Sequence, residues 1–460
     1  MKSSSTLLLS SEEESTPSSR RRPLNSLETF FVSYNVRFAL LLVVMFEGKE
    51  TTTCSKEFVV ERTSTAQIAL DSSRLGHLAI FLLNNSDDDN EKKCWSLVET
   101  EKNINNKVVV RQLPETTKKE LEYGEFLDDI VEQETIPAEG PLSIQIFDDT
   151  SSSRQTTMLY INGNHAMVDG RSLTHLLGLA TGMYEPTLEW KGITLPDWKD
   201  IVEESIASLP KWIAEPPFLH GEHNNLLTLN DLSSIKTSKS ESFRDSFSGE
   251  SVTALRFVLK KKCPAGSTIS GFLASLLMHA VAEEYHDKEP KDVGVSMLVD
   301  LRPYFQQRDD GQGEQEIPQA HGTVTLLEST QNLKKKTTNL LSNILDVSVR
   351  MTEQMRHRIS RGEAHRSALA VTNGYFDERA GPKATMELSN LGVCLIPDGT
   401  QLYTAQRFDG YDGVSFMVHS ECNSGGCMRW NMSVGEGLDA TLMKRIFTRA
   451  MDLFEEVAKL

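Results

Sequence analysis

The sequence has few cysteines and no long apolar run, and both absences exclude whole classes of protein. Only 6 of its 460 residues are cysteine, and most of them are scattered, so the disulfide framework of a small secreted domain is not expected. The longest apolar run is FALLLVVMF at residues 38–46, which is far shorter than the roughly 20 residues that a membrane-spanning helix needs. We interpret this run as a buried strand, and we expect a cytoplasmic protein with free thiols and no transmembrane segment.

Positive charge is scarce as well. With 48 lysines and arginines against 65 acidic residues, the formal net charge is -17. A strongly acidic chain repels phosphate backbones and anionic membrane surfaces, so we expect no nucleic-acid partner. Residues 1–22 hold only three consecutive leucines among polar residues, too short an apolar core for a signal peptide. We predict a disordered tail there.

Several frequent catalytic and cofactor-binding signatures are also missing. The chain contains no Gly-x-Ser-x-Gly turn, no phosphate-binding loop and no dinucleotide-binding glycine pattern. Metal binding is only weakly indicated, because Cys422 and Cys427 flank a hairpin-turn sequence without further ligands nearby. A metal site at His165 and Asp169 would need a third ligand that the sequence around them does not supply. We therefore expect no metal and no bound cofactor.

The length and the apolar pattern predict an α/β protein with two lobes. A chain of 460 residues exceeds one ordinary hydrophobic core, and both halves alternate between strand-like and helix-like periodicity. The pattern predicts an N-terminal lobe at residues 23–225, a connecting segment at 226–250, which is polar and serine-rich, and a C-terminal lobe at 251–460. Strands are expected near 108–113, 142–147, 158–161, 254–259, 293–301, 388–396, 413–420 and 428–434, and helices near 65–83, 171–180, 268–285, 333–359 and 440–460.

One segment joins a strand to a helix through a loop with titratable residues. Residues 158–161 are continuously apolar, and the leucine spacing after residue 171 is helical. His165, Asp169 and Gly170 therefore lie in a strand-to-helix loop, where functional sites are often built. A histidine with its ordinary pKa of about 6.5 can accept a proton near neutral pH, so His165 is a candidate general base.

Asp169 allows two interpretations. Its carboxylate can orient the imidazole of His165, as in a Ser-His-Asp triad, or it can hold the loop by pairing with a cation. The second is favoured, because three intervening residues in a tight loop tend to direct the two side chains differently. Arg302 follows an apolar strand in the second half of the chain and is a candidate partner.

The residues of this loop resemble a known family. Asn-His-Ala-Met-Val-Asp-Gly at 164–170 is similar to the His-x-x-x-Asp-Gly signature of the chloramphenicol acetyltransferase-like superfamily. That group includes plant BAHD acyltransferases, fungal alcohol O-acetyltransferases and peptide-synthetase condensation domains. Residues 23–38, 299–303 (VDLRP) and 388–392 (LSNLG) resemble three further family segments in the family's order, so the similarity spans almost the whole chain.

Two departures from the family's patterns favour the alcohol O-acetyltransferase branch. Asn164 stands where condensation domains and wax ester synthases carry a second histidine. The plant Asp-Phe-Gly-Trp-Gly segment is not intact, and residues 408–413 (FDGYDG) are the nearest stretch. Both features separate this chain from the other branches.

The resemblance implies an α/β fold of two chloramphenicol acetyltransferase-like lobes, each a mixed β-sheet flanked by helices, with a tunnel between them. It implies that His165 is the general base that deprotonates an alcohol or amine acceptor for attack on acyl-CoA, which is a co-substrate. Asp169 would have a structural role, facing away from the tunnel and pairing with Arg302. Gly170 would keep the tunnel open beside the base.

Further residues are implied to support the site. Asn164 directly precedes the base. Ser389 or Asn390, in the LSNLG segment, would donate a hydrogen bond to the oxyanion, because the family fold brings that segment close to the base.

Two alternatives to an acyl-CoA-dependent enzyme stay open. A condensation-like module would take its acyl group from a carrier protein, and an acidic chain is poorly suited to dock an acidic carrier. A non-catalytic member of the same fold is the other alternative, against which the intact His165 and Asp169 argue. The expected partners are a small-molecule acceptor and acyl-CoA, and we expect a monomer.

Overall fold

The computed structural model describes twenty stretches of the chain. These are residues 20–24, 26–33, 36–46, 51–73, 75, 78–84, 93–99, 108–112, 123–133, 142–149, 155–185, 225–237, 239–263, 265–287, 289–304, 321–335, 339–372, 384–407, 414–422 and 426–460. Residues 1–19 of the predicted tail and the segment 408–413 lie outside them. No helix in these stretches combines the length and the apolar character that a bilayer crossing requires.

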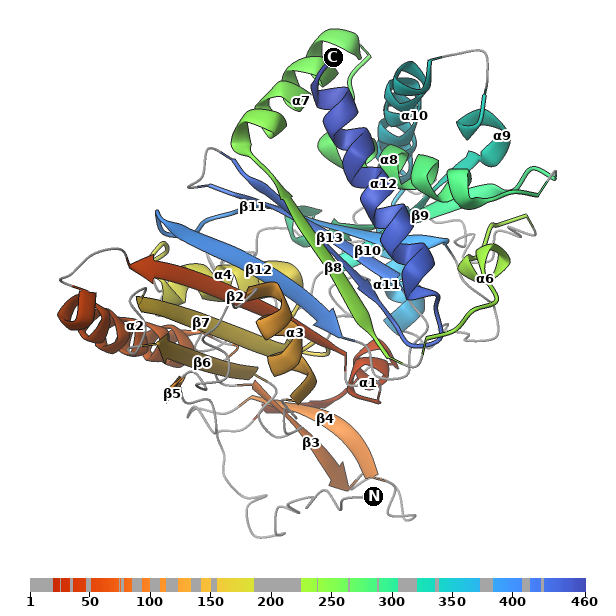
Figure 1. Cartoon of the computed structure of the whole chain (residues 1–460). Coiled ribbons are helices and arrows are strands. Elements are labelled where there is room, and N and C mark those ends of the chain that lie inside the picture. The colour runs from red at the N-terminus through yellow and green to blue at the C-terminus, as the bar shows by residue number, and fades with distance from the viewer. Residues whose placement is uncertain are drawn as a thin grey trace.

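A five-stranded mixed sheet forms the centre of the N-terminal lobe (Figure 1). Its strands, in spatial order, are β12 (Thr400–Arg407), β2 (Arg37–Phe46), β7 (Gln155–Asn164), β6 (Leu142–Asp149) and β5 (Val108–Gln112). In β2, Leu40 and Leu42 pack in one buried cluster, whereas Leu41 and Val43 pack in another on the opposite face. Because both faces are covered, the strand is apolar at nearly every position. The covering helices are α2 (Thr51–Ser72) and α4 (Gly170–Ala180) on one face and α3 (Tyr123–Gln133) on the other.

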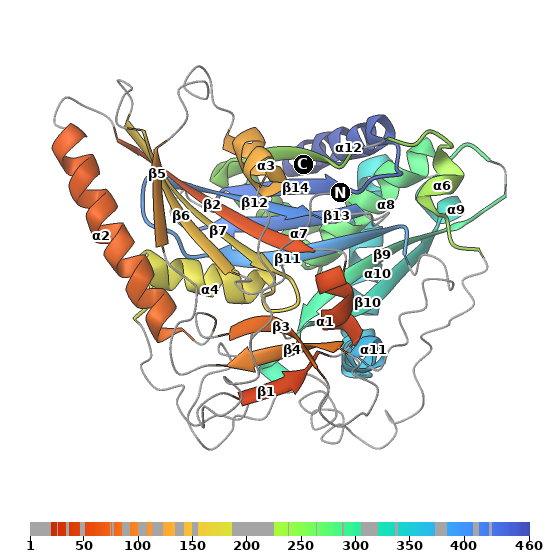
Figure 2. The same ribbon diagram turned by 90° about the horizontal axis from the view of Figure 1, so that it is seen from below.

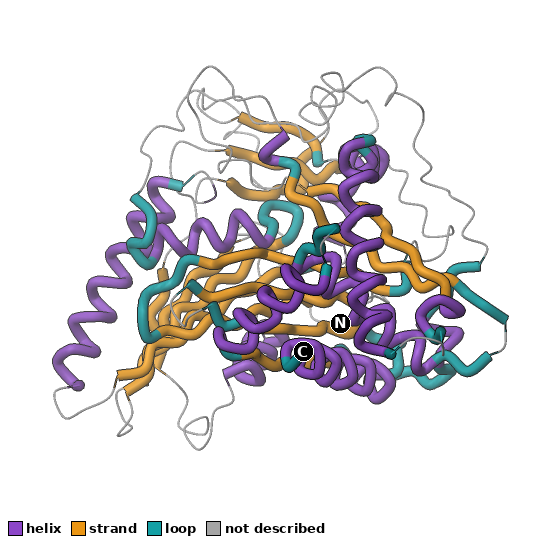
Figure 3. Tube along the Cα trace, turned by 90° about the horizontal axis from the view of Figure 1, so that it is seen from above, coloured by secondary structure: helices purple, strands orange, loops and turns teal. Residues whose placement is uncertain are grey.

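A six-stranded mixed sheet forms the centre of the C-terminal lobe. Its strands, in spatial order, are β10 (His321–Ser329), β9 (Asp292–Asp300), β11 (Met386–Cys394), β13 (Val414–Glu421), β14 (Met428–Val434) and β8 (Glu241–Phe247). Helices cover one face of this sheet and contribute to the largest buried cluster, and Figure 3 shows them in front of the strands. They are α7 (Gly249–Lys262), α8 (Ile269–Glu284), α10 (Leu340–Ser360) and α12 (Ala440–Ala458).

Strand β10, at one edge of the six-stranded sheet, has one apolar face and one polar face. Along β10 the burial alternates strictly between adjacent residues. Val324 and Leu326 are buried in the core beneath the helices, whereas Thr323 and Thr325 are half-buried on the opposite face. This alternation is the period of two expected for a strand with a single core face.

A small sheet and several short helices complete the described structure. The small sheet has the order β1 (Arg20–Pro23), β4 (Lys93–Glu99) and β3 (Leu78–Asn84). Helix α1 (Ser26–Ser33) contacts α11 (Glu363–Thr372), so an N-terminal helix lies against the C-terminal lobe (Figure 2). The remaining short elements are α6 (Leu229–Leu232), α9 (Thr330–Leu333) and the 3₁₀-helix η5 (Arg302–Tyr304).

Strand β12 joins the two lobes. It belongs to the second half of the sequence, yet it pairs antiparallel with β2, from Thr400 opposite Val44 to Arg407 opposite Arg37. The C-terminal half therefore completes the sheet of the N-terminal lobe. A boundary drawn at one position of the chain does not separate the two sheets.

Most of the predicted elements are confirmed, and so is the α/β class with two mixed sheets flanked by helices. The prediction of a strand at 254–259 is wrong, because these residues lie within α7. Val252, Leu255 and Val258 are buried at helical spacing, and Ser248 caps the helix. The short apolar stretch in this helix carries no clear alternation, so its periodicity was ambiguous.

Three further predictions need correction. The helix predicted at 65–83 ends at Ser72, and residues 78–84 form β3 instead. The connecting segment at 226–250 contains β8, in which Phe243 and Phe247 pack against the core while polar residues alternate with them. The predicted tail is wrong at its end, because Arg20 begins β1.

Candidate active site

The His165 loop is built by the end of β7 and the start of α4. Asp169 is the N-cap residue of α4: its Oδ1 accepts a hydrogen bond from the Ser172 N–H at 2.9 Å. In return, the Asp169 N–H donates to the Ser172 hydroxyl at 2.9 Å. This capping box satisfies two otherwise unpaired donors at the helix start. It fixes where the loop ends and the helix begins.

The imidazole of His165 is held in one orientation. Its Nδ1 lies 2.7 Å from the Val168 carbonyl oxygen, and its ring stacks on Phe31 with 4.5 Å between centroids. A carbonyl oxygen can only accept a hydrogen bond, so Nδ1 carries the proton and Nε2 carries the basic lone pair. Burial lowers the pKa of His165, while the nearby Asp169 charge acts in the opposite direction. The ring is therefore neutral at neutral pH, as a general base must be.

The predicted pairing of Asp169 with Arg302 is confirmed. Asp169 Oδ2 lies 2.8 Å from Arg302 Nη2, and both residues are buried. Arg302 also pairs with Asp300 at 3.1 Å. Since the Val168 carbonyl holds Nδ1 of His165, Asp169 does not orient the imidazole as in a triad. The carboxylate instead ties the loop of the N-terminal lobe to the C-terminal lobe.

Gly170 lies against the other lobe. A Cβ added at this position would overlap the side chain of Leu391 on β11. Arg171 makes a further contact between the lobes, because its Nη1 donates to the Leu391 carbonyl at 3.3 Å. The glycine therefore lies where α4 approaches β11 closely. Its expected role in keeping a tunnel open stays a prediction.

His321 joins the site, although sequence reasoning did not select it. Its ring centroid lies 5.7 Å from that of His165. Burial, helped by the neighbouring His165, lowers the pKa of His321 to about 4. The β9–β10 pairing places His321 opposite Asp300, close to Arg302. The sequence signal for the position of His321 is the antiparallel pairing of β9 with β10. In such a pair, a residue that begins β10 must lie beside the end of β9.

Of the other predicted supporting residues, Asn164 and Asn390 have hydrogen-bond partners within the protein. Asn164 Oδ1 accepts a hydrogen bond from the Ala166 N–H at 2.9 Å, which shapes the turn around His165. Asn390 Nδ2 donates to the Ser270 hydroxyl at 3.0 Å, and its Oδ1 accepts from the Gly392 N–H at 3.0 Å. Ser389 is buried. A role of Ser389 or Asn390 at the oxyanion stays a prediction.

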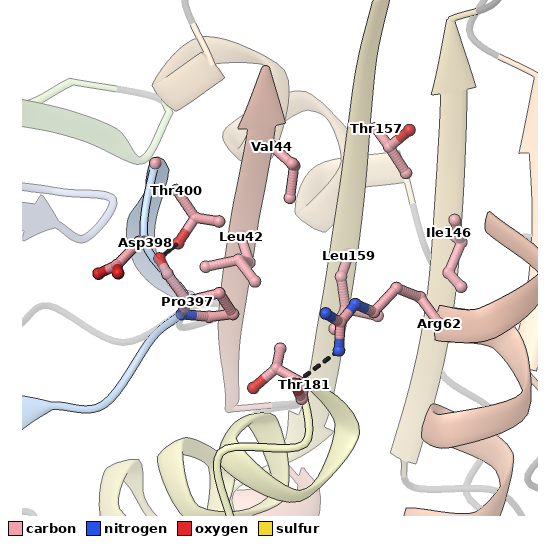
Figure 4. Close-up of a pocket in the computed structure, with 11 residues that line it drawn as sticks. Leu42, Val44, Arg62, Ile146, Thr157, Leu159, Thr181, Pro397, Asp398 and Thr400 are labelled. Atoms are coloured by element: carbon pink, nitrogen blue, oxygen red, sulfur yellow. Dashed lines mark hydrogen bonds between the residues drawn. The ribbon is translucent and has the colours of Figure 1, made fainter. Parts of the chain in front are cut away.

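Two described cavities lie away from His165. One of about 300 Å³ lies between α2 and the five-stranded sheet, with Leu42, Thr157 and Asp398 among its lining residues (Figure 4). Thr157 precedes His165 by eight residues along β7, roughly 26 Å of extended strand, so this cavity is remote from the base. The other, of about 330 Å³, lies between the lobes and is lined from α3, β8, β12, β13 and β14. The predicted tunnel at His165 stays a prediction.

Metal ligands do not gather anywhere in the described stretches: no group of three or more His, Cys, Asp or Glu residues is placed to hold an ion. Cys422 is exposed and Cys427 is half-buried. Their strands place Glu421, not Cys422, opposite Cys427, because the Glu421 N–H donates to the Cys427 carbonyl at 2.8 Å. The two cysteines therefore do not face each other directly across the hairpin.

The two lobes, their mixed sheets and the histidine loop between them define a chloramphenicol acetyltransferase-like fold. Trichothecene 15-O-acetyltransferase TRI3 from Fusarium sporotrichioides is similar with a TM-score of 0.67 and 13% identity, over 95% of this chain and 96% of its own. The epimerization domain from the third module of tyrocidine synthetase B follows with a TM-score of 0.63 and 10% identity, over 96% of each chain. The condensation domain of the monacolin K polyketide synthase MokA has a TM-score of 0.57 and 10% identity, over 95% of this chain and 97% of its own. No family model and no curated protein matches the sequence.

Proposed function

We propose that the chain is an acyltransferase that moves an acyl group from acyl-CoA to an alcohol or amine acceptor, with His165 as general base. One observation carries this proposal. The Val168 carbonyl accepts the Nδ1 proton of a buried imidazole, which leaves Nε2 as the basic atom at the meeting point of the two lobes. The ion pair between Asp169 and Arg302 holds the loop in that place.

The proposed reaction uses this single imidazole twice. Nε2 of His165 takes the proton from the acceptor hydroxyl or amine as its oxygen or nitrogen attacks the thioester carbonyl carbon. The tetrahedral intermediate then collapses, the carbon–sulfur bond breaks, and the imidazolium returns the proton to the leaving CoA sulfur. The ester or amide and free CoA are the products, and His165 ends neutral as it began.

The similar structures support the chemistry to different extents. An acetyltransferase is among them, and the order of sequence segments around His165 and Arg302 resembles the acyl-CoA-dependent alcohol O-acetyltransferases. Condensation and epimerization domains are also similar, and they favour a second candidate, a carrier-protein-dependent module. Asn164 in place of a second histidine favours the acyl-CoA reaction over that candidate.

The test is the release of free thiol from acetyl-CoA in the presence of a panel of alcohols and amines. His165→Ala should lower the rate by about 10²–10⁴-fold, the usual contribution of a general base. His286→Ala is a matched control, because this histidine is exposed. An unchanged rate in His165→Ala would refute the assignment of the base. Transfer only from an acyl-loaded carrier protein would favour the second candidate.

A further inference from the structure

His321 is the first residue of β10, and the packing around it holds its ring beside His165. The β9–β10 register places it at the end of β9, and its ring centroid lies 5.7 Å from that of His165, with 37° between the ring planes. The next residue, Gly322, lies so close to α11 that an added Cβ would overlap the Ala364 carbonyl oxygen. Helix α11 also contacts α1, which carries Phe31, the ring stacked on His165. The same group of elements therefore positions both imidazoles.

The ring nitrogens of His321 are not used inside the protein. Neither has a hydrogen-bond partner among the residues that the structure describes, and the residue is half-buried. The core histidine His279 differs: its Nδ1 lies 2.8 Å from the Ser275 carbonyl oxygen, and its Nε2 lies 3.3 Å from Asn343 Nδ2. A structural polar side chain finds its partners within the protein. The nitrogens of His321 are therefore available to a ligand.

The imidazole of His321 is neutral at neutral pH. Burial lowers its pKa to about 4, the neighbouring His165 and Arg302 act in the same direction, and Asp169 opposes them. Arg302 pairs with both Asp169 and Asp300, so these carboxylates already have a cation. A neutral imidazole carries one N–H donor and one acceptor nitrogen. It can polarise a carbonyl oxygen through that N–H without giving up its proton.

The place of His321 matches the charge that develops during acyl transfer. In the proposed reaction, the acceptor atom that contacts Nε2 of His165 bonds to the thioester carbonyl carbon, and the carbonyl oxygen then carries the negative charge. Both atoms are attached to one carbon, so the groups that contact them must themselves be neighbours. Donors that stabilise such an oxyanion lie about 2.7–3.1 Å from it. Two imidazoles with centroids 5.7 Å apart meet this condition.

The two residues that the sequence predicts at the oxyanion are less well placed. Asn390 already uses its amide donor, because its Nδ2 donates to the Ser270 hydroxyl at 3.0 Å. Ser389 belongs to β11, which is two strands away from β10 in the sheet, roughly 10 Å across it. Only His321, of these three, combines an unused donor with a measured position beside the base.

We propose that His321 is a catalytic residue whose ring N–H donates a hydrogen bond to the thioester carbonyl oxygen as that oxygen becomes negatively charged. This assignment rests on the proposed acyltransferase function. When the acceptor atom bonds to the carbonyl carbon, the C=O π electrons move to the oxygen, and the N–H of His321 stabilises that charge. The electrons return when the carbon–sulfur bond breaks. His165 carries the transferred proton, and His321 keeps its own throughout.

His321→Phe tests the proposal, because it keeps a flat ring and removes the donor. With acetyl-CoA and the panel of alcohols and amines, kcat should fall about 10²–10³-fold, the usual value of one oxyanion donor, and KM for acetyl-CoA should change little. Every acceptor attacks the same carbonyl group, so the loss should be the same for each alcohol and amine. His357→Phe, at an exposed histidine on α10, is the matched control and should change neither constant.

Two amide variants separate a lost hydrogen bond from a lost ring. The amide N–H of His321→Asn stands near the place of Nδ1, and that of His321→Gln stands near the place of Nε2. At least one of them should exceed His321→Phe in kcat by about 10-fold or more. If neither does, the proposal is overturned.

A CoA thioether tests whether His321 merely holds the site together. S-Ethyl-CoA lacks the carbonyl oxygen, so calorimetry should give the same affinity for the native chain and for His321→Phe. Weaker binding to the variant would assign His321 a structural role and overturn the proposal.

The outcomes also separate this proposal from the proposed function. Thiol release by the native chain, together with an unchanged kcat or a raised KM alone in His321→Phe, overturns the role of His321 and leaves His165 as the base. A loss that differs among the acceptors would place His321 at the acceptor, which overturns the proposal as well. If the native chain releases no thiol with any acceptor, the proposed function fails and this assignment fails with it.

Discussion

Arg302→Met removes the ion pair that ties the two lobes together beside His165. Arg302 and Asp169 are each only 5% exposed, and Nη2 lies 2.8 Å from Oδ2. Asp169 keeps the hydrogen bond from the Ser172 N–H, which compensates its charge only in part. Methionine fills much of the volume of the arginine but leaves the carboxylate buried without its cation.

The expected loss is about 3–5 kcal/mol in the free energy of unfolding, which is the range for removing one partner of a buried ion pair. The double variant Arg302→Met/Asp169→Asn removes both charges, so it should recover part of that loss. Arg445→Met is the matched control. Arg445 pairs with Glu284, but its side chain is 54% exposed, and such pairs contribute about 0–1 kcal/mol.

Urea denaturation followed by circular dichroism measures all three variants against the native chain. The order of stability should be Arg445→Met first, then the double variant, then Arg302→Met. Similar losses in Arg302→Met and Arg445→Met would show that the pair between the lobes is no stronger than a surface contact. A double variant as unstable as Arg302→Met would show that the uncompensated Asp169 charge is not the cause.

Three other predictions concern the same loop. Burial lowers the pKa of His165, so the imidazole stays neutral as the pH falls. We therefore expect kcat/KM to stay level down to about pH 6.5 and to fall only below it. A decline that starts at alkaline pH would contradict this. Gly170→Ala should lower the free energy of unfolding by about 1–3 kcal/mol, because the new Cβ meets Leu391. Adding Leu391→Ala to this variant should restore part of the lost free energy. If urea denaturation shows no recovery, the strain lies elsewhere. Phe31→Leu removes the ring stacked on His165. It should lower the free energy of unfolding by about 0.5–1.5 kcal/mol and should also lower kcat/KM. Full activity would show that stacking does not position the base.

Local periodicity predicted much of the fold. The strand and helix on either side of His165 follow from a continuous apolar run and from leucines at helical spacing, and both are confirmed as β7 and α4. The reason is that the burial of each element sets its own local pattern. β7 is buried on both faces, with Leu159 and Ile161 in one cluster and Met158 and Tyr160 in another, whereas α4 buries leucines at helical spacing. The same reasoning failed at α7, where the apolar stretch is too short to separate a period of two from a period of 3.6.

The pairing of Asp169 with Arg302 was predicted from sequence, since two motifs of one family contain the two residues. His321 was not, because no local pattern connects it with His165. Its position depends on the register of the β9–β10 hairpin and on how the two lobes meet. Contacts between residues far apart in the chain are set by such registers, which periodicity alone does not encode.

The sequence by itself determined the class of the fold, the strand–loop–helix around His165 and the residue types at the candidate site. Only the tertiary structure decided which nitrogen of the imidazole is basic, since the Val168 carbonyl that accepts the Nδ1 proton is positioned by the folded loop. It also decided that β12 crosses to the other lobe. The physical reason is the same in both cases: a hydrogen bond or a strand pairing depends on the distance between groups that only folding brings together.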